Sequence, residues 1–329
     1  MKLATLKNNT RDGQLVLVDR TLVRAAAVAD LAPTMQALLD NWSALYPALN
    51  ERYRLLNDDQ LPGAFDFKIE SAMAPLPRAY QWCDGSAYLS HAELVRKARN
   101  AEMPDFLYSD PLMYQGASDT FIGPFDDIEV ADEAWGIDLE AEIAIIVDDV
   151  PMGISAAQAT QHIKLIALVN DVSLRNLMPR ELSKGFGFLQ SKPSTAFAAV
   201  TVTPDELEQH WNGACLNLKV RTQVNGEILG EPHAAADLNF DFPTLIAHAA
   251  GTRRLSAGTI IGSGTISNRN PEAGFACIQE RRMTEIIATG APKTEFLKFG
   301  DSVEVEVALP DGSSVFGPIR QRVAKYHAS

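Results

Sequence analysis

The sequence DLEAEIAIIV, residues 138–147, decides the fold prediction because it is typical of a β-strand with two different faces. Side chains of a strand point alternately to its two sides. One side is wholly apolar, whereas Glu140 and Glu142 share the other side with Ala144 and Ile146. A solvated strand face is one interpretation of the two glutamates. The apolar neighbours favour another, in which two buried carboxylates need a counter-charge and a divalent cation supplies it.

Two further carboxylates are candidates for the same ion. Asp171 ends an apolar run, where a strand would leave the core, although a turn or cap residue would have the same pattern. Asp84 lies in the segment DGSAYLSH, residues 84–91. Carboxylate oxygens are hard ligands that suit Mg²⁺, Ca²⁺ or Mn²⁺, whereas zinc favours histidine and cysteine. We therefore expect a divalent metal cofactor of this hard class.

The composition is that of a soluble globular protein and argues against several classes of function. The 329 residues are 46% hydrophobic, and 42 acidic against 29 basic side chains give a formal net charge of −13. A chain this acidic without a basic patch is not expected to bind nucleic acid. No apolar run approaches the ~20 residues of a membrane span. Three scattered cysteines favour a reducing compartment, so we expect a cytoplasmic protein without a membrane partner.

The chain is predicted to divide into a small N-terminal β-rich domain, residues 1–75, and a main domain, residues 76–329. Alternating or β-rich segments predict strands at residues 2–7, 14–19 and 21–27. Apolar residues at helical spacing then predict helical structure over residues 33–56. The prolines within residues 74–78 stiffen the chain and mark the entry to the main domain.

Strand-like segments dominate the main domain, so the predicted fold class is α+β and mostly β. Ser155 and Gln158 have the spacing of a capping box and predict a helix that runs to about Leu165. The pair Asn225-Gly226 predicts a tight hairpin turn. Further predicted elements are a buried strand at residues 166–172, a helix at 242–250, a strand at 259–266 and a last hairpin at 303–317.

Four segments together resemble the fumarylacetoacetate hydrolase family, in the family's order and spacing. They are DLEAE at residues 138–142, NDVSLR at residues 170–175, Lys192, and GSGTIS at residues 262–267. The resemblance covers residues 78–323, and residues 1–75 fit the small N-terminal domain of longer members. It implies a fumarylacetoacetase-like mixed β-sandwich roll for the catalytic domain and a homodimeric assembly.

The resemblance also implies a metal site and a reaction. One divalent metal would be bound by Glu140, Glu142 and Asp171, with Asp84 as a weaker fourth ligand. The implied reaction is metal-dependent hydrolysis of a C–C bond in a small diketo acid, such as fumarylacetoacetate or an acylpyruvate. Such a reaction serves the catabolism of aromatic compounds or aromatic amino acids, including tyrosine degradation.

Alternative functions remain open from the sequence. Within the family they are a hydratase, decarboxylase or isomerase acting on a 2-oxo-alkenedioate. Outside enzymes the alternative is a non-catalytic metal-binding protein. A cupin-type oxygenase would need a histidine-rich ligand set that this sequence does not show.

A catalytic base is implied at His91. In longer family members an aspartate precedes the catalytic histidine by seven residues, and Asp84 and His91 have this spacing. Without the resemblance, the residues around His91 favour a surface histidine at the start of a helix. The family's histidine-orienting glutamate corresponds to Glu280, although the local alignment is ambiguous with Gln279.

Family positions that bind substrate are matched by Tyr114, Arg175, Lys192 and Thr265. Arg175 and Lys192 are also implied in catalysis, as the cations that meet the developing negative charge. The chain departs from the fumarylacetoacetase pattern at Met178, where the pattern has glutamine, and at Leu182, where it has tyrosine. We therefore expect a substrate that is less polar than fumarylacetoacetate at this end, or one bound in a shifted pose.

Overall fold

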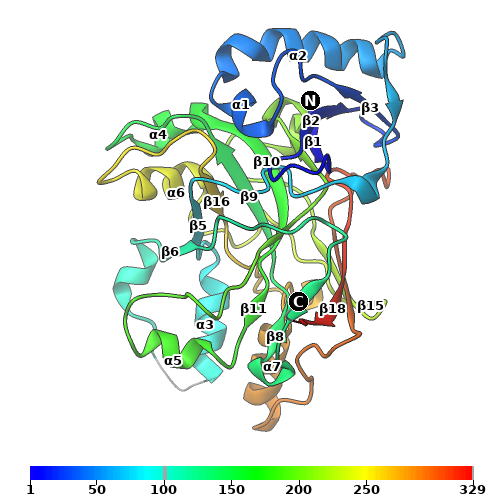
Figure 1. The fold of residues 1–329 in the computed structure, drawn as a ribbon. Coiled ribbons are helices and arrows are strands. Elements are labelled where there is room, and N and C mark those ends of the chain that lie inside the picture. The colour runs from blue at the N-terminus through cyan, green and yellow to red at the C-terminus, as the bar shows by residue number, and fades with distance from the viewer. Residues whose placement is uncertain (99–101, 328–329) are drawn as a thin grey trace.

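The alternating segment at residues 138–147 forms β9, Ala141–Val147, which lies inside a large mixed sheet (Figure 1). The computed structural model describes residues 1–98 and 102–327. The other strands of this sheet are β1 Lys2–Leu6, β2 Gln14–Val18, β3 Arg24–Ala27, β4 Phe65–Asp66, β5 Trp82–Gly85, β6 Met113–Gly116, β10 Ile163–Asn170, β12 Ala196–Phe197, β13 Val200–Val202 and β16 Ile260–Gly262. Their order is β4-β3-β2-β1-β13-β10-β9-β16-β5-β6, and β12 pairs with β10.

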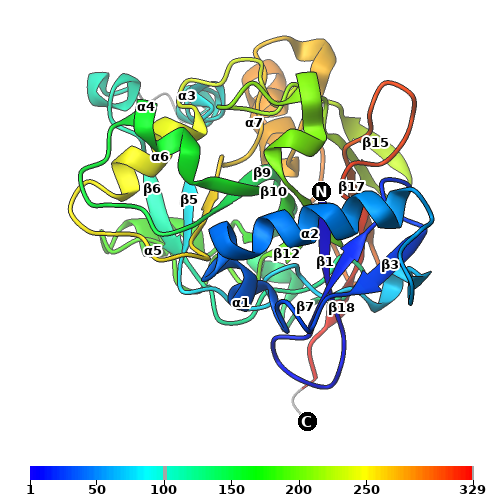
Figure 2. The same cartoon turned by 90° about the horizontal axis from the view of Figure 1, so that it is seen from above.

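The N-terminal strands extend this sheet. β1 is antiparallel to β13, with Lys2 opposite Val202, so the hydrogen-bonded ladder continues from the main domain into the N-terminal segment. Two helices, α1 Met35–Leu39 and α2 Trp42–Asn57, cover the N-terminal strands, and α2 crosses over them in the view from above (Figure 2). The predicted helical stretch is therefore confirmed, with a break at Asp40 and Asn41.

A second sheet packs beside the first and carries the hairpin predicted at Asn225-Gly226. Its strands are β7 Ile128–Val130, β14 Arg221–Val224, β15 Glu227–Gly230, β17 Ser302–Glu306 and β18 Ile319–Lys325, in the order β15-β14-β17-β18-β7. The last hairpin was predicted to end at residue 317, but its returning strand lies further along the chain, at Ile319–Lys325. Asn225 and Gly226, both with positive φ, form the predicted turn between β14 and β15. A short antiparallel pair, β8 Ile137–Asp138 and β11 Ser173–Leu174, precedes β9 and follows β10. The mostly β fold class is confirmed.

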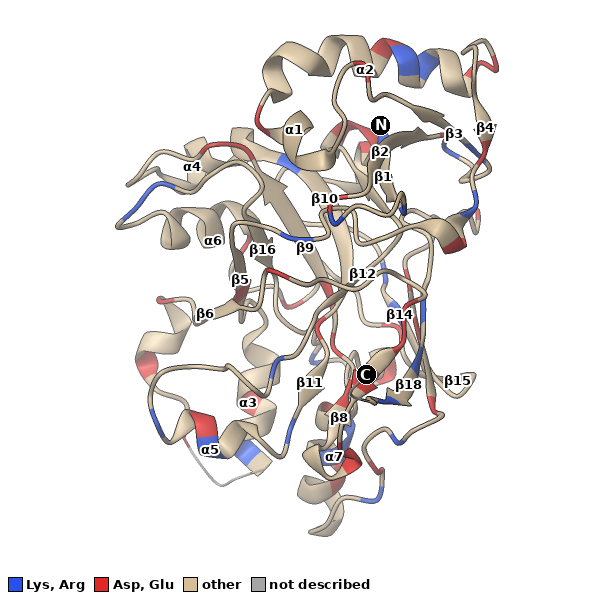
Figure 3. Cartoon of the chain, in the orientation of Figure 1, with Lys and Arg blue, Asp and Glu red and all other residues tan. Residues whose placement is uncertain are grey.

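Three helices gather at the end of the molecule opposite to α1 and α2: α3 Leu89–Ala98, α5 Met178–Leu182 and α7 Ile278–Thr289 (Figure 1). The remaining helices are α4 Ala156–Ala159 and α6 Phe242–Ala249, with short 3₁₀ segments at Ile69–Ser71, Asp105–Tyr108, Glu133–Trp135, Thr160–His162, Pro204–His210 and Pro271–Ala273. Charged residues are prominent on α2, α5 and α7, whereas most of β9 and β10 is uncharged (Figure 3). No helix in the described ranges is both long and apolar enough to span a membrane.

The two faces of β9 belong to two separate hydrophobic clusters. Ile143 and Ile145 lie in one cluster, and Ala144 and Ile146 lie in the other. This confirms the predicted alternation and places both glutamates in the same set of alternate positions as Ala144 and Ile146. A strand buried on both faces is typical of the middle of a covered sheet.

The predicted capping box at Ser155 was wrong about the length of its helix. The Ser155 hydroxyl donates to the Gln158 side chain at 2.8 Å and caps no backbone N–H, and α4 ends at Ala159. β10 begins at Ile163, because the apolar run pairs there with β9 and is buried on the sheet. Tertiary burial thus overrides a local helix signal. The strand predicted at residues 259–266 is also shorter, since β16 ends at Gly262.

Candidate functional site

Three carboxylates meet on one face of the large sheet. Asp84 lies near the end of β5, two residues after Trp82 and therefore on the same strand face. Glu142 lies on β9. Asp171 follows β10, two residues after Val169. Trp82 and Val169 belong to the same hydrophobic cluster as Ala144, so strand periodicity directs all three carboxylates to this side. One oxygen from each carboxylate lies within 4.8 Å of the others. The structure thus brings together three of the four predicted metal ligands.

The close approach of these strands requires a glycine at position 262. Gly262 lies between β9 and β5, opposite Ala144 on one side and Asp84 on the other. A Cβ atom at this position would be 2.4 Å from Oδ1 of Asp84 and 2.4 Å from the Trp82 ring. The glycine-rich segment therefore makes room for the Asp84 carboxylate. Gly264 then donates its N–H to Asp84 Oδ1 at 3.1 Å.

Glu142 is the residue of this cluster that most needs a partner. Both of its carboxylate oxygens are buried and have no hydrogen-bond donor within the described parts of the chain. Burial and the neighbouring carboxylates of Asp84 and Asp171 raise the pKa of Glu142 well above its usual range. Burial, followed by the charge of Asp171, raises the pKa of Asp84 to about 8. Unpaired oxygens among crowded hard ligands fit a divalent cation of the magnesium or manganese class.

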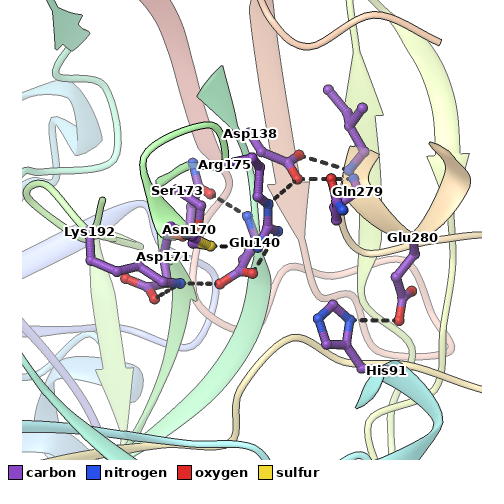
Figure 4. A network of polar contacts seen from close by, with 12 residues as sticks. His91, Asp138, Glu140, Asn170, Asp171, Ser173, Arg175, Lys192, Gln279 and Glu280 are labelled. Atoms are coloured by element: carbon purple, nitrogen blue, oxygen red, sulfur yellow. Dashed lines mark hydrogen bonds and ion pairs between the residues drawn. The ribbon is translucent and has the colours of Figure 1, made fainter. Parts of the chain in front are cut away.

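Glu140, the fourth predicted ligand, is directed instead to two cations (Figure 4). Arg175 Nη2 lies 2.6 Å from Glu140 Oε1, and the Lys192 ammonium contacts both Glu140 and Asp171. Burial alone would raise the pKa of Glu140, but these cations lower it, so the carboxylate stays ionised. Burial would lower the pKa of Lys192, but Asp171 and Glu140 raise it, so the ammonium stays charged. Glu140 and Lys192 therefore form a charged bridge to the metal-ligand cluster.

Asp138 connects this network to α7. It is fully buried and accepts hydrogen bonds from Arg175 Nε at 2.8 Å and from the backbone N–H groups of Ile278 and Gln279 at 2.8 and 3.0 Å (Figure 4). These N–H groups open α7 and have no partner within the helix. Asp138 therefore holds the beginning of α7 and the Arg175 guanidinium in one place. The sequence pattern did not single out this residue, although it lies just before the two glutamates.

The predicted base lies beside α7. His91 is in the first turn of α3, as predicted, and its Nδ1 is 2.9 Å from Glu280 Oε1 on α7 (Figure 4). Glu280 is buried, whereas His91 is half-buried and lines a cavity of about 580 Å³. With Nδ1 directed to Glu280, Nε2 is the nitrogen left to act in the cavity. The sequence left Glu280 and Gln279 as alternatives for the residue that orients His91, and the structure pairs His91 with Glu280. Gln279 lines the cavity instead.

The remaining predicted site residues line the same cavity. The Tyr114 hydroxyl donates to Asp171 Oδ2 at 2.7 Å, and its ring packs edge-on against Phe188. Burial, followed by the charge of Asp171, raises the pKa of Tyr114 well above its usual range, so the hydroxyl remains a donor. Thr265 is nearly buried in the wall formed by the glycine-rich segment. Met178 and Leu182, the two departures from the family pattern, both lie on α5 and give the cavity an apolar wall.

The loop between α5 and Lys192 is held by Glu181, a residue that sequence reasoning missed. Its carboxylate accepts from the backbone N–H groups of Leu189, Gln190 and Ser191 and from the Ser191 hydroxyl. Burial alone would raise the pKa of Glu181, but these donors lower it to about 2. The clamp orders the loop that carries Phe188 into the cavity and leads to Lys192. No motif in the sequence around Glu181 points to this role.

The comparison with family models identifies the chain. A model described as fumarylacetoacetate (FAA) hydrolase C-terminal matches residues 81–324. The chain belongs to the fumarylacetoacetate hydrolase family. A second model of this family, fumarylacetoacetase N-terminal domain 2, matches residues 1–78. The family resemblance deduced from four short segments is confirmed.

Curated relatives in the family include oxaloacetate tautomerases. Oxaloacetate tautomerase YisK of Bacillus subtilis is 26% identical over 256 residues, which are 76% of this chain and 74% of that protein. A human mitochondrial oxaloacetate tautomerase is 25% identical over 187 residues, which are 56% of this chain and 54% of that protein. The match to the human relative thus spans little more than half of its length.

Solved structures of family members share the fold over the whole chain. Fumarylacetoacetate hydrolase from Exiguobacterium antarcticum has a TM-score of 0.67 at 18% identity, covering 99% of this chain and 100% of that one. Maleylpyruvate hydrolase from Sphingobium sp. SYK-6 has a TM-score of 0.65 at 17% identity with the same coverage, and a second structure of it contains manganese(II) and pyruvate. The fumarylacetoacetase-like architecture is confirmed, and the family contains hydrolases, isomerases and tautomerases.

Replacing Glu181 tests the loop clamp. Glu181→Gln should lower the free energy of unfolding by about 1–3 kcal/mol, because three backbone N–H groups and the buried Ser191 hydroxyl lose an ionised acceptor. The pKa of Glu181 is lower in the folded chain than the ordinary ~4.3 of the unfolded one, so its contribution is complete above that pH. It should be lost as the pH falls towards 2. Chemical denaturation at pH 7 and pH 3 checks this, and an equal effect of the substitution at both pH values would contradict it.

Replacing Glu142 tests the metal site. The wild-type chain should bind Mg²⁺ or Mn²⁺ in a calorimetric titration, and Glu142→Gln should lose most of this affinity. Because burial raises the pKa of Asp84 to about 8, metal must displace a proton at neutral pH. Affinity should therefore rise between pH 6 and pH 8. The surface variant Glu304→Gln is the control, and a protein that binds no ion at either pH would rule out the site.

Proposed function

We propose that the protein is a metal-dependent hydrolase that cleaves a C–C bond in a diketo acid. The observation that carries this proposal is the His91–Glu280 pair. His91 lines the same cavity as Asp84 of the carboxylate cluster and the cations Arg175 and Lys192. A base for water, a cation site and fixed positive charge are the parts that such a hydrolysis needs. Their convergence in one cavity supports catalysis over mere metal binding.

The candidate metal ligands are Asp84, Glu142 and Asp171, with Glu140 joined to them through Lys192. A divalent ion held there would supply Lewis-acid stabilisation for the enolate that leaves when the C–C bond breaks. The unpaired oxygens of Glu142 are the observation that supports this ion. Mg²⁺, Mn²⁺ and Ca²⁺ all suit an all-oxygen ligand set, and the manganese in the maleylpyruvate hydrolase structure is in keeping with this choice.

His91 begins the reaction by taking a proton from water at Nε2. Glu280 holds the other ring nitrogen at 2.9 Å and stabilises the imidazolium that forms. The hydroxide adds to the carbonyl carbon, and the bond between this carbon and the neighbouring methylene then breaks. Its electron pair passes to the methylene side as the enolate, and a proton returns to that carbon. The products are a carboxylate and a 2-oxo acid.

Arg175 and Lys192 meet the negative charge of the substrate and of the transition state. Both are nearly buried, so their field acts in a site from which most water is excluded. Asp138 and Glu140 hold them in place, which means that little reorganisation is needed when charge develops. We assign Tyr114 and Thr265 to binding of the substrate's oxygens, because both residues line the same cavity.

We place the substrate among diketo acids with at least one carboxylate, such as the acylpyruvates that arise in breakdown of aromatic compounds. The apolar wall formed by Met178 and Leu182 favours a substrate less polar than fumarylacetoacetate on that side. A cytoplasmic homodimer, expected from the sequence, stays part of this proposal. Light scattering at working concentration would test the assembly.

A second candidate function is keto–enol tautomerisation of a 2-oxo acid. It is favoured by the curated relatives, of which YisK aligns over 76% of this chain. The same base and metal site could move a proton between carbon and oxygen of oxaloacetate without breaking a C–C bond. The two functions differ in their product, because only hydrolysis consumes water and releases a second carboxylic acid.

One assay decides between these functions. The purified protein with Mg²⁺ or Mn²⁺ would be given acetylpyruvate, fumarylpyruvate, fumarylacetoacetate and oxaloacetate. Release of a carboxylic acid, detected by chromatography, supports hydrolysis. Loss of enol absorbance from oxaloacetate without acid release supports the tautomerase. No turnover of any substrate in the presence of bound metal would leave the non-catalytic alternative.

Replacing His91 tests the base. His91→Ala should lower kcat by at least ~100-fold, the usual size of a general-base contribution, while metal affinity stays unchanged. Glu280→Gln should lower kcat less and leave the fold intact, because the imidazole remains and only its orientation weakens. His248→Ala, at a half-exposed site on α6, is the matched control and should keep wild-type turnover. Near wild-type activity of His91→Ala would place the base elsewhere.

A further inference from the structure

Arg282 is a cation in the cavity that the proposed reaction does not use and that the family resemblance does not match. It lies on α7, two residues after Glu280, and lines the same cavity as His91. Gln279 and Met283, one helical turn apart, also face the cavity. Helical geometry then places Glu280 and Arg282 on opposite flanks of that face. The helix that holds the base therefore also presents a positive charge to the substrate space.

The Arg282 side chain is held in a defined orientation. Its guanidinium carbon lies 4.2 Å from the centroid of the Phe296 ring, and Nη1 donates to the carbonyl oxygen of Thr294. Phe296 is itself part of the cavity wall. Stacking on an aromatic face orients the guanidinium plane and leaves its edge as the free hydrogen-bonding surface.

That edge lacks a partner. Arg282 Nε is buried and has no hydrogen-bond acceptor in residues 1–98 and 102–327. Within these residues, no carboxylate lies at ion-pair distance from the Arg282 guanidinium. Arg175 and Lys192, in contrast, are already paired with carboxylates. A buried donor without an acceptor is costly, and a carboxylate is the ligand that matches the Nε–Nη2 edge of a guanidinium with two parallel hydrogen bonds.

We propose that Arg282 forms a second anion subsite, which binds the acyl-side carboxylate of a dicarboxylate diketo acid. The proposal rests on the proposed function and narrows its substrate class from diketo acids with at least one carboxylate to those with two. Arg175 is tied to the start of α7 through Asp138, and Arg282 lies about one turn further along the helix, an axial rise of ~6 Å. The two cationic positions can therefore engage different ends of one substrate. The proposal requires the Arg282 side chain to turn so that Nε, which is buried here, and Nη2 face the incoming carboxylate.

Two substrates that differ in this carboxylate test the subsite. Fumarylpyruvate carries a carboxylate on its acyl side, whereas acetylpyruvate carries a methyl group there. Arg282→Gln should lower kcat/KM for fumarylpyruvate by about 10- to 100-fold, the usual range for loss of a charge-assisted hydrogen bond. It should change kcat/KM for acetylpyruvate less than about 3-fold. Arg282→Lys should recover part of the loss, because the charge remains without the bidentate edge.

Arg281→Gln is the matched control. Arg281 is the neighbouring residue on α7, is half-exposed and pairs with Glu285 outside the cavity, so its replacement should leave both substrates unaffected. An equal loss for both substrates in Arg282→Gln would show that Arg282 only holds the Thr294 and Phe296 loop, and would overturn the proposal. A preserved preference for fumarylpyruvate would overturn it as well.

A binding experiment keeps the subsite testable if the proposed hydrolysis fails. Fumarate and crotonate differ by one carboxylate replaced with a methyl group, and both can be titrated into the metal-loaded protein by calorimetry. The wild-type chain should bind fumarate more tightly than crotonate, and Arg282→Gln should reduce this preference by the same 10- to 100-fold. If the wild type turns over neither diketo acid, the proposed reaction is wrong while this preference still supports the subsite. Equal affinities for the two acids in the wild type would reject the subsite.

Discussion

The constraint on which the site depends is the burial of negative charge at one end of the large sheet. Five carboxylates are buried there: Asp84, Asp138, Glu140, Glu142 and Asp171. The two cations among them, Arg175 and Lys192, contact only three of the five, namely Asp138, Glu140 and Asp171. Ionised carboxylates without a partner are costly to bury, so the cluster of Asp84, Glu142 and Asp171 needs either protons or a divalent cation. The pKa values of Asp84 and Glu142 are raised for the same reason, because burial and neighbouring carboxylates favour the protonated form.

This charge network also positions the groups that surround it. Asp138 accepts from the first N–H groups of α7 and from Arg175, so the helix that carries Glu280 is joined directly to the guanidinium. Lys192 joins Glu140 to Asp171, and the Glu181 clamp orders the loop just before Lys192. The base, the two cations and Asp171 therefore form one connected unit, and Asp84 and Glu142 lie beside it. A substitution in this unit is expected to affect several of its members together.

The two departures from the fumarylacetoacetase pattern that line the cavity, Met178 and Leu182, lie on α5 in its wall. The carboxylates and cations suit any reaction that passes through a stabilised enolate, and proteins named as hydrolases, isomerases and tautomerases are found among those similar to this chain. α5 supplies an apolar wall with Met178 and Leu182, and α7 supplies Arg282 on Phe296. Discrimination between substrates is thus expected to come from the helices, which contact the parts of a substrate that do not react.

Local periodicity by itself determines the central strand of the site and its two faces. The alternation of residues 138–147 predicts a strand with Glu140 and Glu142 on one side, and the end of an apolar run indicates Asp171 as a candidate at a strand end. Whether these carboxylates are buried together is left open by the pattern. Motif spacing adds His91 and Lys192, because the chain keeps the family's order of segments. Only the tertiary structure decides that Asp84 joins Glu142 across Gly262, since β5 reaches β9 through a strand that lies far away in sequence. It also decides that Glu280 and not Gln279 faces His91, and that Arg282 Nε lacks a partner within the described residues. These contacts depend on how α7 is rotated about its axis and on packing between segments that are distant in sequence. Neither produces a periodic pattern of residues that could be recognised in the sequence.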